Sequence, residues 1–254
     1  MEYAYLSSSV SIKTVSEDAK EGVFEIEGLF AGYGLTMGNA LRRALLSSLP
    51  GAAVTEIKIK NVPHEFSTLP GLKEDIVELA LNFKKLRFRL HVDEPQVLSL
   101  KVKGERVVTA GDIEVNSNVE LVNPDEVIGT LTAKDAELDM EVKVERGLGY
   151  VPVEARKNEG RLPIGTIAVD AIFTPVSRVN YTVEDMRVGD RTDYNRLRLE
   201  ITTDGTISPS SALHKASNIL KDHFEKVSTV TVSEFDAPKV APEKKKAAKS
   251  KKSE

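Results

Sequence analysis

The chain has 254 residues, 41% hydrophobic and 29% charged, the ordinary composition of a globular protein with room for one large domain or two modest ones. It contains no cysteine, so disulfides and thiolate metal sites are excluded and a reducing compartment is expected. The net charge of −4 combines +5 on residues 239–254 with −9 on the remainder, and that acidic body repels nucleic-acid phosphate.

The chain shows no sign of a membrane segment or an export signal. No apolar run approaches the roughly 18 residues needed to span a bilayer. The N-terminus, Met1 to Tyr5, lacks the basic region of a signal peptide. We therefore expect a cytoplasmic protein without a membrane partner.

The first third predicts two strands, a helix and another strand. Residues 9–12 and 23–29 alternate apolar and polar side chains around a polar turn at 17–22. A glycine-rich turn leads to Thr36, a candidate N-cap, and the helix that follows is stopped by Pro50 and Gly51. Residues 52–60 have the period of two that predicts a strand.

The predicted first helix has two faces of different character. At about 100° per residue, one broad face is mostly apolar and the other carries two arginines and a leucine. An exposed leucine beside two arginines is more than solubility requires, so we expect one face to pack in the fold and the other to meet a protein partner. The apolar face holds Met37, Ala40, Leu41, Ala44, Leu45, Ser48 and Leu49, and the other holds Asn39, Arg42, Arg43 and Leu46.

The middle of the chain predicts a β-rich unit with one helix. Apolar residues at helical spacing predict that helix between Leu72 and Phe83. Short apolar runs separated by turn signals then predict strands at 86–92, 96–102, 119–122, 127–131, 136–144 and 166–173. Two more strands are predicted after this unit, at 177–183 and 196–203.

The C-terminal part predicts an amphipathic helix and then a disordered tail. The helix spans 210–227, and residues 234–254 form a Lys-rich tail with almost nothing to bury. The tail lysines leave open a weak, non-specific DNA contact, although such a run is more often a solvated end. The apolar arc of the helix contains Ala212, Leu213, Ala216, Ile219, Leu220, Phe224 and Val227, with His223 inside it as a candidate interface histidine.

A phosphate site at the glycine-rich turn is one alternative function. Gly32, Gly34 and Gly38 open a helix that carries Arg42 and Arg43, and a helix N-terminus can bind anions. The spacing is neither a dinucleotide fingerprint nor a P-loop, so tight packing of the turn is the favoured interpretation.

No residue pattern indicates catalysis. The four histidines lack ligand spacing, and the acidic pairs, such as Glu74-Asp75, have no nucleophile beside them. Ser47-Ser48 lacks the setting of a hydrolase nucleophile. Tyr150, after two glycines, is interpreted as a lid on the core in preference to a contact residue. We expect no catalytic residue, metal site or cofactor of its own.

Several motifs in order resemble the bacterial RNA polymerase alpha subunit family. The longest runs from Gly34 to Gly51 and coincides with the two-faced helix. The resemblance extends over about residues 5–232. The further motifs are Ala53 to Glu56, His64 to Thr68, Glu74 to Ile76, Arg146 to Pro152, Pro163 to Gly165, Val169 to Ala171, Arg191 to Asp193 and Asp204 to Ile207.

This resemblance implies an α+β fold of two domains and an assembly role. A discontinuous dimerisation domain, 1–50 and 175–233, combines antiparallel sheet with two amphipathic helices, and a β-rich domain, 51–174, is inserted in it. The implied function is a non-catalytic subunit of DNA-directed RNA polymerase, which forms a homodimer and scaffolds the beta and beta-prime subunits. Magnesium and zinc of the holoenzyme would lie in other subunits.

The resemblance also implies site residues. Beta would contact Arg42, Arg43, Leu46, Glu65, Arg191 and Asp193, and beta-prime would contact Lys84. The implied dimer interface comprises Met37, Leu41, Leu45, Leu213, Ala216, Ile219, Leu220, His223, Phe224 and Val227. The family's small C-terminal domain that binds promoter DNA has no counterpart here, which is either natural or due to truncation.

Overall fold

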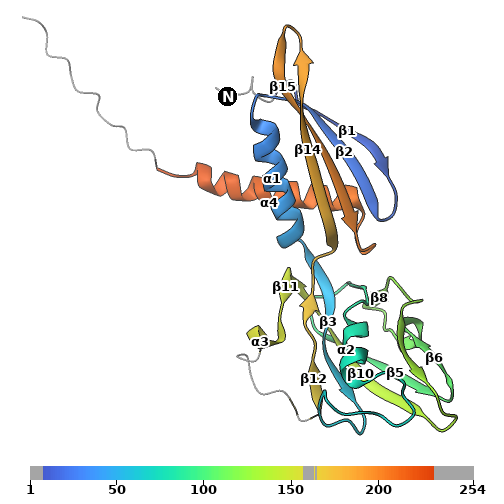
Figure 1. Ribbon diagram of the computed structural model, residues 1–254. Coiled ribbons are helices and arrows are strands. Elements are labelled where there is room, and N and C mark those ends of the chain that lie inside the picture. The colour runs from blue at the N-terminus through green and yellow to red at the C-terminus, as the bar shows by residue number, and fades with distance from the viewer. Residues whose placement is uncertain (1–7, 157–162, 164, 232–254) are drawn as a thin grey trace, which may run out of the picture.

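Two lobes, each built on an antiparallel sheet, are joined end to end (Figure 1). The computed structural model describes residues 8–156, 163 and 165–231. The architecture is α+β, as the family resemblance implies, with few helices and mainly antiparallel strands. We call the lobes by their main sheets: the four-stranded lobe holds both ends of the described chain, and the seven-stranded lobe holds the middle.

The four-stranded lobe combines segments from both ends of the chain. Its sheet has the order β1-β2-β15-β14, so a strand from the C-terminal part pairs with one from the N-terminal part. Its elements are β1 (Ser11–Glu17), β2 (Glu21–Leu29), α1 (Tyr33–Ser47), β14 (Val176–Val188), β15 (Arg191–Thr203) and α4 (Pro209–Ser228).

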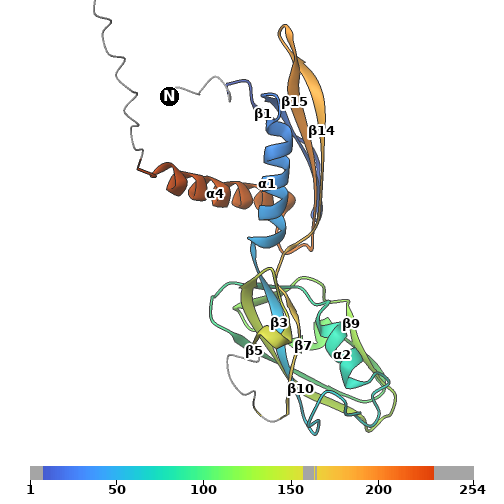
Figure 2. The same cartoon turned by 60° about the vertical axis from the view of Figure 1, so that its left-hand side comes forward.

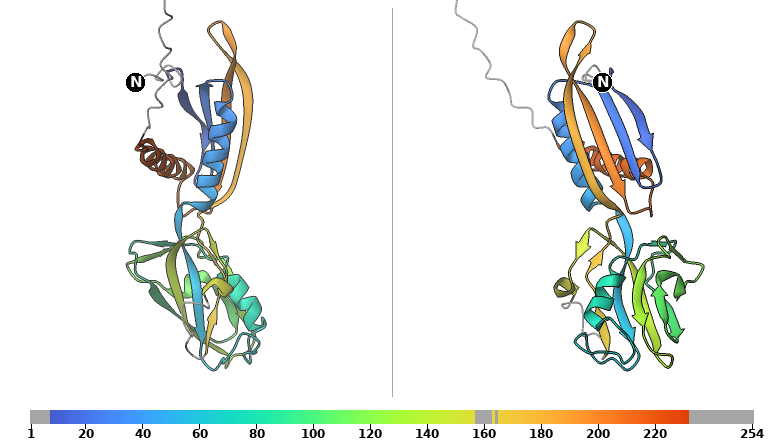
Figure 3. Two further views of the ribbon diagram at one scale, coloured as in Figure 1. Left: turned by 90° about the vertical axis from the view of Figure 1, so that its left-hand side faces the viewer. Right: turned by 45° about the vertical axis from the view of Figure 1, so that its right-hand side comes forward.

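One face of this sheet is apolar and covered, and the other is charged. Helix α1 packs on β14 and β15 (Figure 3). This packing buries Leu41 and Leu45 against apolar strand residues such as Leu197 and Leu199. The opposite face carries ion pairs between strands, including Arg198 with Glu25. An antiparallel sheet with one face in water typically shows this alternation.

Helix α4 crosses α1 and then extends beyond the lobe (Figure 2). Its first half buries Ala212 and Ala216, small side chains that allow close approach to α1. From Lys221 to Ser228 every residue is exposed. Only half of this helix is therefore held by its own chain.

The seven-stranded lobe is a β-rich unit wrapped around one helix. Its main sheet has the order β7-β5-β10-β3-β4-β8, with β12 also paired to β3. Helix α2 packs under β9, and its residues Ile76, Leu79 and Phe83 are fully buried in one contiguous core. The elements are β3 (Pro50–Ile59), α2 (Ile76–Phe83), β4 (Phe88–Leu90), β5 (Gln96–Lys103), β6 (Arg106–Thr109), η2 (Ala110–Asp112), β7 (Ile113–Glu114), β8 (Val119–Leu121), β9 (Val127–Leu131), β10 (Glu137–Leu148), β11 (Tyr150–Val151), α3 (Val153–Arg156), β12 (Thr166–Ala168) and β13 (Ala171–Ile172).

The predicted starts of the first two helices, α1 and α2, were wrong. Helix α1 begins at Tyr33 and not at Thr36, because Gly32 adopts a left-handed conformation that redirects the chain before the helix. Helix α2 begins at Ile76, where the Asp75 side chain accepts a hydrogen bond from the Glu78 amide. Leu72, which the pattern placed in this helix, instead bridges to Leu131.

Several strands also differ from their predicted bounds. The predicted strand 166–173 is split into β12 and β13, which pair with different partners. Strands β14 and β15 are longer than predicted and form a hairpin that turns at Gly189 and Asp190. The short β6, β7, β11 and α3 were not predicted, since two to four residues are too few to show a period.

Candidate interaction surfaces

The outward face of α1 presents two exposed arginines. Arg42 and Arg43 are exposed, and no ion pair involves either of them within the part of the chain that the structure describes. Leu46, predicted on the same exposed face, is instead partly buried against the core cluster that contains Leu45 and Ala216. It lies at the border of the two faces, where α4 crosses, so the outward face is mainly cationic.

The glycine-rich turn at the start of α1 is closed by the protein itself. The buried Asn195 side chain accepts hydrogen bonds from the Gly32 amide at 2.9 Å and the Gly34 amide at 3.4 Å. A Cβ on Gly34 would lie 2.6 Å from Val183, and one on Gly38 would lie 2.7 Å from Tyr181. These glycines serve close packing, and the amides that would bind a phosphate already have a partner.

Lys84 lies in a small polar cluster at the end of α2. Its Nζ is 3.1 Å from Oδ2 of Asp170 and 5.9 Å from the centre of the Tyr150 ring. The backbone N–H of Val153 and the Lys84 ammonium keep the pKa of Asp170 below its ordinary value. Desolvation and a hydrogen bond to Asp170 raise the pKa of Tyr150. Tyr150 is 56% exposed, so the interpretation as a lid on the core was wrong.

A groove of about 280 Å³ brings Lys84 together with Glu65. The family resemblance implies different partners for these two residues, but they line the same hollow. The groove is mainly apolar, and Phe66 at its edge is 81% exposed, an unusual position for a large aromatic side chain. An apolar hollow that is lined in addition by two acids, Glu65 and Asp170, and one amine, Lys84, has the chemistry of a protein-docking groove.

Arg191 and Asp193 lie at the hairpin end of the four-stranded lobe. The guanidinium binds the carboxylate through Nε at 3.0 Å and Nη2 at 2.6 Å. It also lies over the rings of Phe30 and Tyr194 at 4.8 and 5.3 Å. The two predicted contact residues therefore satisfy each other, and the exposed feature is the aromatic and guanidinium stack.

The predicted dimer residues divide into two groups. Leu41, Leu45 and Ala216 are buried in the core of a single chain, so the structure contradicts their assignment to a surface that a second copy could contact. The reason is that Leu41 and Leu45 face the sheet on which α1 packs, and Ala216 lies where α4 crosses α1. Met37, Leu213, Ile219 and Leu220 are partly buried against the same core.

The second group lies on the free half of α4 and is exposed. Phe224 and Val227 are 66% and 69% exposed. His223 is also exposed, and its Nδ1 lies 2.7 Å from the Ile219 carbonyl oxygen.

The remaining predictions concern metals, membranes and the tail. Across the described residues, no three His, Asp or Glu side chains gather closely enough to hold a metal ion. None of the helices in this part of the chain is long and apolar enough to cross a bilayer. The tail from 234 to 254 lies outside the described residues.

Sequence reasoning missed the residues that complete these surfaces. Asp170 and Asn195 gain their roles from partners 86 and 163 positions away, which no local pattern indicates. The only available signal was their place within or near the family motifs.

Comparison with known proteins shows the family to which this chain belongs. Residues 57–174 match the family model described as the RNA polymerase Rpb3/RpoA insert domain. The DNA-directed RNA polymerase subunit alpha of Symbiobacterium thermophilum is 53% identical over 216 residues, covering 84% of this chain and 68% of the relative. The chain belongs to the bacterial RNA polymerase alpha subunit family. The alpha subunits of Roseiflexus sp. RS-1 (51% identical, 89% of this chain, 67% of the relative) and Moorella thermoacetica (52%, 82% and 66%) agree.

Members of the alpha subunit family belong to a multisubunit enzyme, a DNA-directed nucleotidyltransferase. The matched insert domain corresponds closely to the seven-stranded lobe, which occupies the middle of the chain. The alpha subunits match this chain over about two thirds of their own length.

Proposed function

We propose that this protein acts in transcription as a homodimer on which the beta and beta-prime subunits of RNA polymerase assemble, in the cytoplasm. The observation that carries the proposal is the free half of α4. Phe224 and Val227, three residues apart on this helix, are 66% and 69% exposed, and Val230, just beyond the last helical residue Ser228, is 71% exposed. Side chains at this spacing form one ridge along a helix, and this ridge has no partner within the described chain.

A second copy of the chain is the occupant we assign to this ridge. Fully burying a Phe or Val side chain contributes about 1.5–3 kcal/mol, so a ridge repeated in both copies favours association strongly. Two copies related by a two-fold axis present the same ridge to each other. The small Ala212 and Ala216 bring the first half of α4 close to α1, so the second half, which carries the ridge, extends from a helix anchored in the core of the lobe.

Two further surfaces are assigned to the catalytic subunits. The exposed Arg42 and Arg43 of α1 suit an acidic surface, because a guanidinium binds a carboxylate with two parallel hydrogen bonds. We assign this face to beta. The groove that holds Glu65 and Lys84 is assigned to beta-prime, with Glu65 moved from the beta set because it lines the same hollow. Arg191 and Asp193 stay as secondary candidates for beta.

Light scattering coupled to size exclusion tests the proposal. The protein alone is expected to elute with the mass of a dimer, and addition of beta is expected to give a complex containing two alpha chains and one beta. A monomer at all concentrations would overturn the dimer, and a dimer that ignores both beta and beta-prime would overturn the scaffold.

A further inference from the structure

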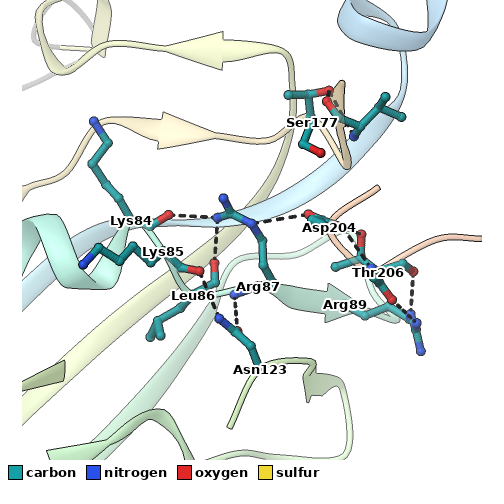
Figure 4. A network of polar contacts seen from close by, with 12 residues as sticks. Lys84, Lys85, Leu86, Arg87, Arg89, Asn123, Ser177, Asp204 and Thr206 are labelled. Carbon is teal, nitrogen blue, oxygen red and sulfur yellow. Dashed lines mark hydrogen bonds and ion pairs between the residues drawn. The ribbon is translucent and has the colours of Figure 1, made fainter. Parts of the chain in front are cut away.

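The two lobes are held together by a polar network as well as by the chain. The chain crosses between the lobes twice, at residues 48–50 and 173–176. A third connection is non-covalent (Figure 4): the loop 204–207, between β15 and α4, meets the segment 84–89 of the seven-stranded lobe. Two covalent crossings at one place form a hinge, and a contact beside them restricts its angle.

Arg87 and Asp204 form the centre of this network. Nε of Arg87 lies 3.5 Å from Oδ2 of Asp204, and their side chains are only 26% and 13% exposed. Next to them, Nε of Arg89 donates to the carbonyl oxygen of Thr206 at 3.0 Å. A largely buried ion pair is costly to break on one side, because the remaining charge loses its partner without regaining full hydration.

Each member of the pair is fixed by its own lobe. Nη1 of Arg87 donates to the carbonyl oxygens of Lys84 at 2.8 Å and Leu86 at 3.1 Å, where the end of α2 carries partial negative charge. Oδ1 of Asp204 accepts from the amide and the hydroxyl of Thr206 at 2.9 and 2.6 Å. The Asp204 amide donates to the carbonyl of Pro175 at a chain crossing. Neither side chain is therefore free to follow a moving partner.

The network joins the two surfaces that assembly requires. The loop that contains Asp204 leads directly to Ser208, the N-cap of α4. The segment that contains Arg87 begins at Lys84, whose ammonium lies at the groove. One ion pair thus lies between the start of the projecting helix and the end of the helix that carries the groove.

We propose that Arg87 and Asp204 are positioning residues, which hold the groove of the seven-stranded lobe at one angle to α4. The consequence for assembly rests on the proposed function, since the angle fixes where a subunit bound at the groove lies relative to the dimer axis. The angle itself is a property of the single chain. Removing the pair leaves both surfaces intact and frees their relative orientation.

Distances between spin labels test the angle directly. Because the chain has no cysteine, Lys101→Cys on β5 and Thr182→Cys on β14 give one exposed label in each lobe without further changes. Pulsed double-resonance spectra are recorded on labelled protein diluted with a large excess of unlabelled protein, so that distances within one chain dominate. We expect a narrow distribution that becomes broad or shifted with Arg87→Gln and with Asp204→Asn.

Asp204→Asn is less disruptive to the local fold than Arg87→Gln. Asp204→Asn keeps an oxygen that accepts from Thr206, so the turn before α4 is preserved while the charge on Arg87 loses its partner. The double variant is expected to broaden the distribution no more than either single one. The matched control is Arg106→Gln, which removes the Arg106–Asp112 ion pair within the seven-stranded lobe and is expected to leave the distribution narrow. Unchanged distances in both Arg87→Gln and Asp204→Asn would overturn the proposal.

A second readout separates this proposal from the proposed function. The same variants are expected to remain dimers and to capture beta-prime about tenfold more weakly, within the range of typical coupling energies. If the unmodified protein fails to dimerise or to bind beta-prime, the proposed function fails, whereas the spin-label distances still decide whether the pair sets the angle. Full capture by variants with broadened distances would show that the angle has no role in assembly.

Discussion

The two lobes differ in how completely each buries its own apolar surface. In the seven-stranded lobe one large cluster surrounds α2, with Leu79 and Phe83 fully buried, beside a small cluster of Ala53, Ala171 and Phe173. In the four-stranded lobe the core is divided into two smaller clusters beneath α1. Its last helix leaves Phe224 and Val227 in water. One lobe is complete in a single chain, and the other has a helix that is half packed.

This difference indicates that the two lobes have different roles in assembly. A lobe with a closed core keeps its shape whether or not a partner is present, so it suits a rigid surface for other subunits. A lobe with an unpaired helix gains stability when that helix is covered, so its stability depends on protein concentration. Tests that separate the two lobes therefore sharpen the comparison.

The largest expected effect is on the free half of α4. Phe224→Glu places a charge on the ridge, and two copies would then bury unpaired carboxylates against each other. We expect the dimer dissociation constant to rise about a hundredfold or more, as for a central interface residue. Analytical ultracentrifugation over a concentration series measures it.

The matched control for Phe224→Glu lies in the other lobe. Val97 on β5 is 61% exposed, so Val97→Glu adds the same charge at a similarly exposed apolar position. This variant is expected to remain a dimer. Equal dissociation constants for the two variants would mean that the free half of α4 is not the interface.

The next effect tests whether the seven-stranded lobe unfolds independently of the four-stranded lobe. Leu79→Ala in the core of α2 removes a fully buried side chain and is expected to cost about 3 kcal/mol of unfolding free energy. Because the two cores are separate, the loss should lower the melting of this lobe while the dimer persists. Calorimetry with light scattering on the same sample follows both.

Leu81→Ala is the control on the same helix, since Leu81 is 52% exposed. We expect its melting temperature to stay close to that of the unmodified protein. A single cooperative transition that shifts as a whole with Leu79→Ala, together with loss of the dimer, would contradict the independence of the lobes.

Local patterns predicted most of the secondary structure but not how its ends are fixed. The apolar spacing of Leu41, Ala44 and Leu45 correctly predicted the buried face of α1. The predicted N-cap of the same helix, Thr36, lies four residues after the observed N-cap Gly32, whose amide binds Asn195, far along the chain. A boundary set by such a distant partner leaves no trace in the local sequence.

The sequence predicted a surface residue correctly where the helical period alone decides whether its side chain is exposed. Arg42 and Arg43 are exposed, as the helical wheel of α1 indicates, whereas Leu46 is not, because α4 crosses there. The Arg87–Asp204 pair could not be found in this way, since it joins residues of two lobes. Periodicity describes one element at a time, and a surface formed by several elements needs their arrangement.

A smaller effect is expected at the outward face of α1. Arg43→Ala removes an exposed guanidinium and should leave the dimer intact while weakening beta binding about tenfold, or about 1.4 kcal/mol. The control is Arg178→Ala, another exposed arginine without an ion pair among the described residues. Loss of the dimer with Arg43→Ala would show that this face of α1 belongs to the dimer interface.

The smallest effect is expected at Asp170 and depends on pH. The hydrogen bond from Val153 and the neighbouring Lys84 lower the pKa of Asp170 in the folded protein. Such a carboxylate stabilises the fold at pH values above its unfolded pKa of about 4, and this contribution is lost as the pH falls through the lower folded pKa. Asp170→Asn should therefore cost about 1 kcal/mol at pH 7, allowing for partial exposure, and less at pH 3.

Urea unfolding at the two pH values, with Asp125→Asn as the control, measures this difference. Asp125 is exposed and forms no ion pair in the described residues, so its substitution should leave the unfolding free energy unchanged at both pH values. A cost for Asp170→Asn that is equal at pH 7 and pH 3 would mean that the charge on Asp170 contributes nothing. Lys84 would then be held at the groove by its contact with the Tyr150 ring, and the polar cluster would be no more than a packing arrangement.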